Sequence, residues 1–336
     1  MNIDIPASPL PTPADHAAWL EERRHGIGSS DASAVVGMND YASPYTVWEE
    51  KTGKAPIDVF TDEQRERMNW GNLLEPVIRE ETARRLGIEI AKPDHAHHHP
   101  DRPWQRCNLD GWTSERGIAE FKTTSAMLAW AWDDQIPDHP LIQVHHSALI
   151  TGADHAIIAA LIGGQKLVIQ RVEISQNILD MLMEAEDEFW HKYVERDVPP
   201  PVDGHVATME SIMREWAHKP GAIEVSHDDA FLHWQQYQEA HEDEKDAKRR
   251  KNDARAALAA LMDGHEQLTT GTRVWAAAQR GQLNEKLLQA DDPELYEQFV
   301  VPTPAFDRAA FKAAHPEKFS QYQHTTIRPK GAPKEK

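Results

Sequence analysis

Cysteine is almost absent from this chain, and so are long apolar runs. The single cysteine, Cys107, excludes a disulfide framework and any four-cysteine zinc or iron–sulfur site within the chain. It also fits a reducing cytosol. No apolar run approaches the roughly 20 residues needed to span a bilayer. The stretch MNIDIPASPLPTPADH has neither the basic region nor the apolar region of a signal peptide. We therefore expect a cytoplasmic protein that makes no membrane contact.

Basic residues are also scarce relative to acidic ones. The 36 lysines and arginines face 55 aspartates and glutamates, which gives a formal net charge of −19. Proteins that bind nucleic acid usually present a basic surface, so this balance weighs against such a ligand. Net charge does not describe the distribution of charge, however, and acids at a metal site or on an outer face can coexist with a basic groove. The acidity therefore does not exclude DNA.

What the chain does contain is typical of a soluble globular protein with two domains. Hydrophobic residues make up 40% and charged residues 27% of its 336 positions. Residues 1–14 carry four prolines and little periodicity, which predicts a flexible arm. The proline-rich VPPPVDG (198–204) is the best candidate for a boundary. We predict a first domain over 15–200 and a mainly helical region with a small hairpin over 201–336.

The first domain alternates helical and extended patterns. Hydroxyl or acidic caps and closing glycines predict helices over 16–24, from Ser29 or Ser30, and over 61–87, although Gly71 and Pro76 interrupt the last pattern. Residues 88–123 are short apolar runs separated by turn residues, and two further runs near 155–173 read as a hairpin. Helices on both sides of a mixed sheet therefore define the expected α/β core.

The second region has a different composition. Residues 228–262 form a long charged pattern with spaced apolar or aromatic positions, which predicts one arm of a helical hairpin or a short coiled coil. The basic run KRRKNDAR (248–255) lies within it. This run could contact DNA or could be a solvated helix face, and the second interpretation is favoured.

The stretch LDGWTSERGIAEFKTTS (109–125) is the most informative for chemistry. In an extended strand Glu120 and Lys122 share one face, and Asp110 precedes a neighbouring strand. Two carboxylates are a minimal platform for Mg²⁺, and the backbone carbonyl of Phe121 could add a third oxygen. A lysine beside such a metal would help to activate or orient water. The same three side chains could instead form a structural cluster of ion pairs, and the pattern alone favours that interpretation.

Two further stretches shift this balance. WGNLLEP places Glu75 inside an amphipathic helix, beside Gly71, which permits close approach of a neighbouring backbone. WLEERRHGIGSSDASAVVG places Arg23 before a glycine turn and Ser30 near the start of a helix, an arrangement that suits a phosphate group. Alone, Glu75 could be an exposed helical glutamate and Ser30 a plain helix cap.

Four motifs in order resemble one family. They are W-x₃-R with I-G-x-S-[DE] over 19–31, W-G-x₃-E over 70–75, D-G-x₈-E-x-K over 110–122, and Q-V-x-[YH]-S over 143–147. This order resembles the phage lambda exonuclease and YqaJ-like viral recombinase family, within the PD-(D/E)xK nuclease superfamily. The resemblance covers about residues 16–170 and implies a restriction-endonuclease-like core.

The resemblance implies a role for each residue of the metal site. Asp110 and Glu120 would ligate Mg²⁺, or Mn²⁺ in its place, with two ions per site and help from the carbonyl of Phe121. Lys122 would orient or activate the attacking water. Glu75 would ligate a metal or its bound water.

It likewise implies roles outside that site. Gln143 would position water or substrate beside Lys122, and Arg23 and Ser30 would hold the 5′-phosphate of the cut strand. Two positions depart from the family pattern. Asn108 replaces a phosphate-binding serine, which weakens the case for strict 5′-phosphate dependence, and His146 replaces a tyrosine.

The resemblance implies a 5′→3′ exonuclease that acts on double-stranded DNA ends and leaves 3′ single strands for recombination. It also implies a single-strand annealing protein as partner, a homo-oligomer such as a ring-shaped trimer, and a bacterial or phage-infected cell as the setting. A structure-selective or nicking endonuclease with the same metal site is the enzyme alternative. A DNA-end-binding assembly protein on a degenerate nuclease fold is the alternative without catalysis.

Overall fold

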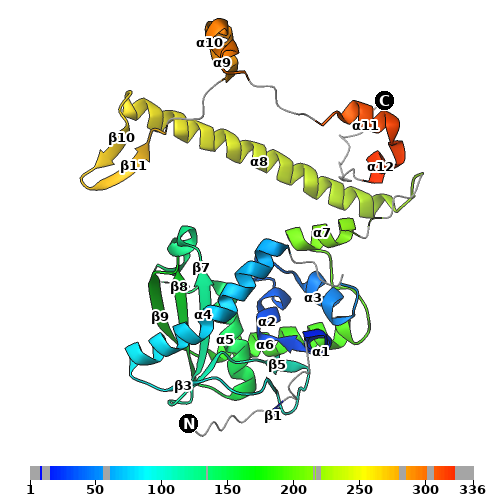
Figure 1. Cartoon of the computed structure of the whole chain (residues 1–336). Helices are drawn as coiled ribbons and strands as arrows, with labels where there is room; N and C mark the ends of the chain where they lie inside the picture. Colours follow the sequence, from blue (N-terminus) through cyan, green and yellow to red (C-terminus); the bar gives the residue numbers. More distant parts are fainter. Residues whose placement is uncertain are drawn as a thin grey trace. The chain divides into compact units, whose positions relative to one another are not determined.

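A computed structural model describes most of the chain, namely residues 8–9, 16–55, 61–133, 135–214, 216, 221–279, 285–300 and 306–321 (Figure 1). Its contacts divide the chain into two units, Met1–Ala217 and His218–Lys336. The predicted arm over 1–14 lies outside the described residues except for β1 (Ser8–Pro9). Within the described part, no helix is both long and apolar enough to cross a bilayer.

A five-stranded mixed sheet is the centre of the first unit. Its strand order is β3-β6-β7-β8-β9, with β7 and β8 parallel and the other neighbours antiparallel. The strands are β3 (Ile90–Ala91), β6 (Gly111–Thr113), β7 (Ile118–Thr124), β8 (His155–Ile162) and β9 (Lys166–Glu173). The turn between β8 and β9 uses Gly163 and Gly164, both with positive φ, which glycine adopts without steric cost.

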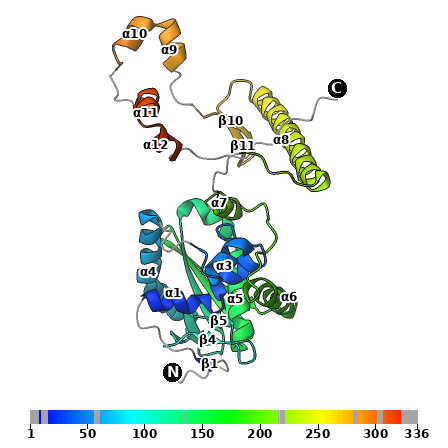
Figure 2. The same cartoon turned by 90° about the vertical axis from the view of Figure 1, so that its right-hand side faces the viewer.

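Helices cover both faces of this sheet, and α4 and α5 lie on opposite sides of it (Figure 2). One core cluster joins Val144 and Ala148 of α5 to the sheet, and another joins Ile78 of α4 to its other face. The helices are α1 (His16–Arg24), α2 (Ser29–Val35), α3 (Pro44–Lys51), α4 (Asp62–Leu86), the 3-10 helix η1 (Ala126–Trp132), α5 (Asp138–Thr151), α6 (Gln176–Glu188), the π-helix η2 (Phe189–Val194) and α7 (Val206–Arg214). The predicted α/β core, a mixed sheet flanked by helices, is confirmed.

A second sheet lies beside the first. Its order is β1-β4-β5-β2, and its remaining strands are β2 (Ile27–Gly28), β4 (His97–His98) and β5 (Gln105–Cys107). The parallel pairing of β2 with β5 brings the start of α2 next to the segment that precedes Asp110.

The long helix α4 is continuous through Pro76, against the expectation that Gly71 and Pro76 interrupt it. It begins after a capping box at Thr61 and ends at Gly87 in the left-handed conformation. Proline removes one hydrogen bond, and packing of Leu74 and Ile78 on the sheet holds the helix together across it. Gly71 lies against β7, since an added Cβ would be 4.0 Å from Oγ1 of Thr123.

Helix α7 follows the proline-rich segment and packs on the first unit. The hydroxyl of Thr208 donates a hydrogen bond of 2.6 Å to the hydroxyl of Ser43. Arg214 pairs at 3.1 Å with Glu49, whose side chain is 3% exposed. The predicted domain limits at 200 and 201 stay a prediction.

The second unit is mainly helical and contains a small hairpin, as predicted. Its elements are α8 (His227–Met262), β10 (Gln267–Thr270), β11 (Arg273–Ala277), α9 (Glu285–Asp291), α10 (Pro293–Glu297), α11 (Arg308–Ala314) and α12 (Pro316–Gln321). Strands β10 and β11 pair antiparallel. None of the unit's described residues is buried.

Candidate active site

Strand β7 presents different chemistry on its two faces. Ala119 and Phe121 pack with Ile78 of α4 on one side of the sheet. Because successive side chains of a strand alternate, Glu120 and Lys122 project toward the other side, where α5 lies. The sequence alternation therefore carries the two charged groups to the face that α5 covers.

Lys122 joins that strand to α5. Its ammonium donates hydrogen bonds to Oε1 of Glu120 at 2.5 Å and to Oε1 of Gln143 at 2.7 Å. Glu120 is 6% exposed, whereas the Lys122 side chain is 26% exposed. The lysine is thus fixed by two oxygen atoms while its ammonium still reaches solvent.

Asp110 lies one residue before β6 and beside this pair. The backbone N–H of Phe121 donates a hydrogen bond of 2.9 Å to its Oδ2. Burial, followed by the negative charges of Glu120 and Glu75, raises the pKa of Asp110 to about 7. The three carboxylates are therefore close enough for like-charge repulsion to add to the effect of burial on the Asp110 pKa.

Glu75 reaches the same region from α4. Its Oε1 accepts hydrogen bonds from Lys92 at 2.7 Å and from Arg79 at 3.2 Å. Arg79 also donates to the carbonyl oxygen of Asp110 at 3.3 Å. Glu75 is thus bound to two cations and linked through one of them to the Asp110 backbone.

The donor chemistry fits a hard divalent cation. Carboxylate oxygens and a backbone carbonyl are the ligands that Mg²⁺ prefers, and a cation would relieve the repulsion that raises the Asp110 pKa. Among the residues described, no group of three or more His, Cys, Asp or Glu side chains has metal-site geometry, and Glu120 and Glu75 are turned to Lys122 and Lys92. Asp110, Glu120, Glu75 and the Phe121 carbonyl are the groups that could hold the ion.

A cavity of about 520 Å³ brings together most of the remaining predicted site residues. Arg23, Ser30, Asn108, Asp110 and Gln143 all line it. The predicted phosphate-binding residues extend from Arg23 to Asn108, 85 positions later in the sequence. They nevertheless line the same cavity as Asp110, the predicted metal ligand. Glu75, Glu120 and Lys122 do not line this cavity and are connected to it through Asp110 and Gln143.

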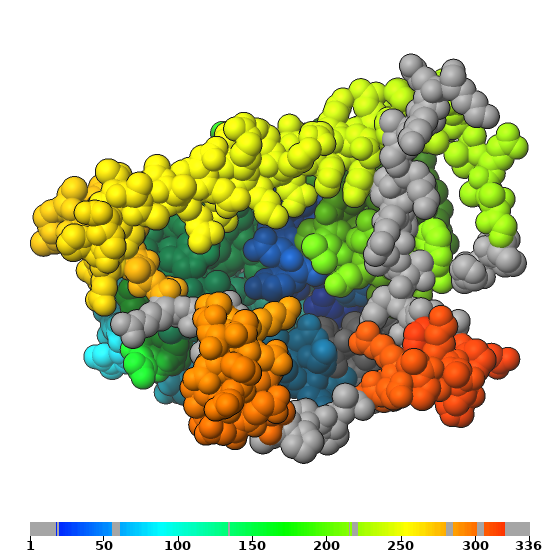
Figure 3. All heavy atoms as spheres, turned by 90° about the horizontal axis from the view of Figure 1, so that it is seen from above, coloured from blue at the N-terminus to red at the C-terminus, as the bar shows by residue number. Residues whose placement is uncertain are grey.

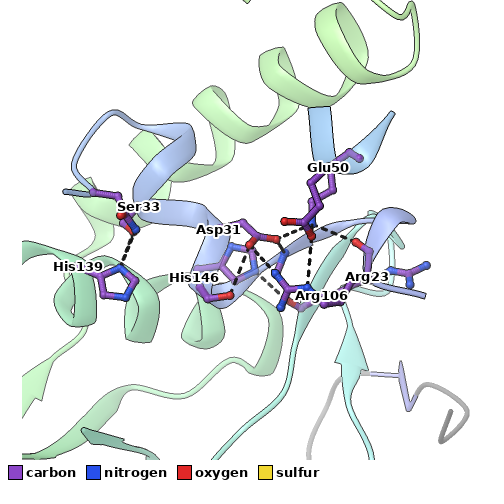
Figure 4. Close-up of polar contacts among 11 residues, drawn as sticks. Arg23, Asp31, Ser33, Glu50, Arg106, His139 and His146 are labelled. Carbon is purple, nitrogen blue, oxygen red and sulfur yellow. Dashed lines mark hydrogen bonds and ion pairs between the residues drawn. The ribbon is translucent and has the colours of Figure 1, made fainter. Parts of the chain in front are cut away.

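Asp31 organises the cationic wall of the cavity and has no assigned role in the sequence prediction. It accepts a hydrogen bond from Arg23 at 2.8 Å (Figure 4). It accepts a second from Lys51 at 2.6 Å. The Lys51 side chain is fully buried, and the two cations hold the pKa of Asp31 well below its usual range despite burial. Arg23 also donates to Glu50 at 3.3 Å. The D/E position of the I-G-x-S-[DE] motif was the signal for this residue.

Arg106 is a second cavity-lining arginine that sequence reasoning missed. Its guanidinium pairs with the carboxylate of Glu22 and donates to the Glu22 carbonyl oxygen at 3.0 Å. The cavity thus contains two arginines, Arg23 and Arg106, and each is held by acids of the first unit. No local motif marks Arg106, because only the pairing of β5 with β2 carries it to the cavity.

His146 occupies the position at which the family pattern has a tyrosine. It is fully buried and does not line the cavity. One ring nitrogen pairs with Glu186 at 2.7 Å and the other lies 2.9 Å from the carbonyl oxygen of Arg106. Both partners are acceptors, so both nitrogens donate and the ring is cationic. The pairing with Glu186 raises the His146 pKa against the opposing effect of burial. His146 therefore fixes the backbone that carries Arg106.

His139 lies one helical turn before Gln143 on α5. Asn39 donates to the hydroxyl of Ser33 at 2.9 Å, so that hydroxyl donates in turn to Nδ1 of His139 at 2.6 Å. Burial and the nearby charge of Lys122 lower the His139 pKa to about 4. The neutral ring consequently carries its proton on Nε2, which is then a hydrogen-bond donor. Helical spacing from Gln143 was the signal that could have found it.

Comparison with known proteins gives a domain assignment. Residues 18–154 match the YqaJ-like viral recombinase domain. The chain is 36% identical over 203 residues to the uncharacterized protein YqaJ of Bacillus subtilis (strain 168), an alignment that covers 59% of this chain and 63% of that protein. It thus spans less than two thirds of the length of this relative.

Solved structures with a similar arrangement include two exonucleases. An alkaline exonuclease (LHK-Exo) from Laribacter hongkongensis, also solved with dAMP, matches with a TM-score of 0.43 and 15% identity over 54% of this chain and 93% of that one. A phage related exonuclease from Haemophilus somnus 129PT matches with a TM-score of 0.35 and 10% identity over 51% of this chain and 96% of that one.

Proposed function

We propose that this chain, whose residues 18–154 match the YqaJ-like viral recombinase domain, is a Mg²⁺-dependent deoxyribonuclease that degrades double-stranded DNA ends in the 5′→3′ direction. The observation that carries this proposal is the meeting of Asp110, Glu120 and Lys122 beside a cavity lined by Arg23 and Ser30. Carboxylates and a lysine at the edge of a phosphate-sized space suit hydrolysis of a phosphodiester.

The carboxylates would hold the metal. Asp110, Glu120, Glu75 and the carbonyl of Phe121 are the ligands in this proposal. A bound divalent cation would supply Lewis-acid stabilisation of charge on the phosphate and would lower the pKa of an attacking water. Hydrogen bonding of the Phe121 N–H to Asp110 keeps one carboxylate oxygen fixed, and the other remains available.

Lys122 and Gln143 would orient the reacting groups. The ammonium of Lys122 is held by Glu120 and Gln143, and it would donate a hydrogen bond to the attacking water or to a phosphate oxygen as negative charge develops. His139 lies close enough to Lys122 for that charge to lower its pKa, and its neutral ring would add a further donor. These donors are fixed before substrate arrives, so little reorganisation is needed during the reaction.

The cavity would bind the terminal phosphate of the strand that is cut. Arg23 is 27% exposed at its side chain and is held by Asp31, so its guanidinium is oriented toward the cavity before DNA binds. Ser30 and Asn108 add an uncharged hydroxyl and an amide. The amide of Asn108 can donate to a phosphate oxygen as a serine hydroxyl does.

A matched set of DNA substrates tests this function. Linear duplexes labelled separately at the 5′ and the 3′ end are incubated with Mg²⁺ and compared with a covalently closed circle, using the native chain and the Lys122→Ala variant. We expect early release of the 5′ label, an intact circle and no cleavage by the variant despite retained DNA binding. Cleavage of the circle would favour the nicking endonuclease, and binding without cleavage by the native chain would favour the DNA-end-binding protein.

The same proposal includes partners that the motif resemblance implies. A single-strand annealing protein would take up the exposed 3′ strand, and several copies of the chain would assemble, as in a ring-shaped trimer. Co-purification of the annealing protein and the mass of the assembly in solution are the measurements that test these two points.

A further inference from the structure

Helix α8 is the longest helix among the described residues of the second unit. It spans 36 residues, none of which is buried, and its side chains lie at the surface along the helix (Figure 3). Tyr237 is 49% exposed and Leu258 37% exposed. Most helices in proteins are stabilised by packing of an apolar face. A helix with this much exposed apolar surface therefore indicates a partner.

The charges of α8 are separated along its length. Residues 227–244 contain six acidic residues and no lysine or arginine, whereas residues 245–262 contain six basic residues and two acidic ones. The helix dipole favours acids in the first turn and bases in the last turn only. It therefore does not account for Glu239–Glu244 or for Lys245–Lys251, which lie in the middle of the helix.

One stripe along α8 follows the heptad spacing of three and four residues that is typical of coiled coils. Its members are Ala230, Trp234, Tyr237, His241, Glu244, Lys248, Lys251, Arg255, Leu258 and Met262. The stripe is apolar or aromatic near both ends and charged in the middle. Such a polar centre lowers stability but specifies the register and direction of pairing.

The stripe is complementary to itself in one direction only. In an antiparallel pair about a two-fold axis near residue 246, Trp234 faces Leu258, and Glu244 faces Lys248 of the second copy. In a parallel pair each of these residues would face its own copy, so that Glu244 would face Glu244 and Lys248 would face Lys248. Like charges at such positions are destabilising.

We propose that α8 is an interaction surface for a second copy of this chain and pairs with α8 of that copy in the antiparallel direction. A two-fold interface uses the same patch on both subunits, and the separated charges of α8 satisfy that requirement. The inference does not depend on the proposed nuclease activity. A DNA duplex is a less suitable occupant, since the acidic half of α8 would repel the phosphate backbone along half the helix.

Disulfide cross-linking in the full-length chain tests the direction of pairing. Tyr237→Cys and Arg255→Cys chains are co-expressed with different affinity tags, and each variant is also expressed alone. The native chain is the negative control, because its only cysteine is buried. In the antiparallel pair position 237 faces position 255, whereas the two copies of position 237 are about 27 Å apart. Disulfides require Cα atoms within about 7 Å, so the mixture should give on the order of tenfold more cross-linked dimer than either single variant.

Charge reversal tests the register of the two α8 helices without any added cysteine. Glu244→Lys places two lysines against each other and should raise the dimer dissociation constant on the order of tenfold at low salt. The double variant Glu244→Lys with Lys248→Glu should restore it. The matched control is Asp246→Lys, which removes ion pairs within the helix to Arg249 and Arg250 but lies outside the stripe. Sedimentation equilibrium measures all four proteins.

Several results would overturn the proposal. Cross-linking of Tyr237→Cys alone would show parallel pairing, and absence of any cross-link in the mixture would show that α8 does not pair with itself. A cross-link that forms only after addition of duplex DNA would show that DNA brings the copies together. If Asp246→Lys and Glu244→Lys raised the dimer dissociation constant equally, the stripe would not be the surface through which α8 pairs.

Discussion

Replacing Asp110 by asparagine tests how the carboxylates at the active site are balanced. In the metal-free protein the pKa of Asp110 is raised to about 7, first by burial and then by Glu120 and Glu75. In the unfolded chain this carboxyl ionises near pH 4. Between these values the folded state retains a proton that the unfolded state has lost. The free energy of unfolding therefore falls as the pH rises from about 4 to about 7, and the loss persists above that range.

The size of the effect follows from the shift. About three pKa units correspond to about 4 kcal/mol, which is an upper limit. Asp110 is partly exposed, so solvent screens part of this interaction and we expect about 2 kcal/mol. Asp110→Asn cannot ionise, and its stability should lack this component of the pH dependence.

Urea unfolding in the presence of a chelator, at about pH 5 and about pH 8, measures the effect. The native chain should lose about 1 kcal/mol more than Asp110→Asn between the two values, because part of the loss has already occurred at pH 5 and the other titrating groups are common to both proteins. Addition of Mg²⁺ at the higher pH should stabilise the native chain more than the variant, because binding to the folded state adds to the free energy of unfolding. Identical pH profiles for the two proteins would contradict the raised pKa of Asp110, and equal stabilisation by Mg²⁺ would contradict its role as a metal ligand.

Three further substitutions test separate parts of the site. Arg23→Gln should slow the degradation of 5′-phosphorylated ends on the order of tenfold more than that of 5′-hydroxyl ends. The reason is that only a phosphorylated end forms a charge-assisted hydrogen bond with Arg23 that the substitution removes. An equal loss of rate on both kinds of end would contradict the role assigned to Arg23. Glu186→Gln leaves the His146 cation buried without its partner and should lower the free energy of unfolding by about 3 kcal/mol in urea titrations, whereas a change near zero would exclude a buried ion pair. His139→Ala should lower the turnover number on the order of tenfold, and His139→Asn should recover part of it, since an amide also donates; an unchanged turnover number would exclude a role of His139 in the reaction.

Local sequence signals predicted the helices and the strand chemistry well. The Thr61 cap and Gly87 mark the limits of α4, and alternation along β7 places Glu120 with Lys122. These features depend on residues a few positions apart, where steric and hydrogen-bonding rules apply directly. The predicted resemblance to the YqaJ-like viral recombinase domain is matched over residues 18–154, and the predicted α/β core is confirmed, since both rest on ordered local motifs.

Contacts between distant segments were not accessible in this way. Lys51 reaches Asp31 across the packing of α3 on α2, and His146 reaches Glu186 across that of α5 on α6. Each pair consists of charges that would be assigned to the surface on composition alone, because charged residues are rarely buried unless paired. Arg106 enters the cavity only through strand pairing. The roles of the catalytic and phosphate-binding residues stay predictions.

Helix α4 shows where a sound local rule is overridden. Proline inside a helix costs about 3 kcal/mol and usually ends or kinks it. Here Leu74 and Ile78, on either side of Pro76, both pack on the sheet, and their burial offsets the lost hydrogen bond. The same continuity places Glu75 next to the carboxylates of the strands.

The most direct test of the account is nucleotide release from a linear duplex by the native chain and by Lys122→Gln, each with Mg²⁺ and with a chelator. Glutamine retains hydrogen-bonding capacity but lacks the positive charge that the proposed water activation requires. The account predicts release only by the native chain with Mg²⁺, with DNA binding preserved in the variant. Release in the chelator, or undiminished release by Lys122→Gln, would contradict it.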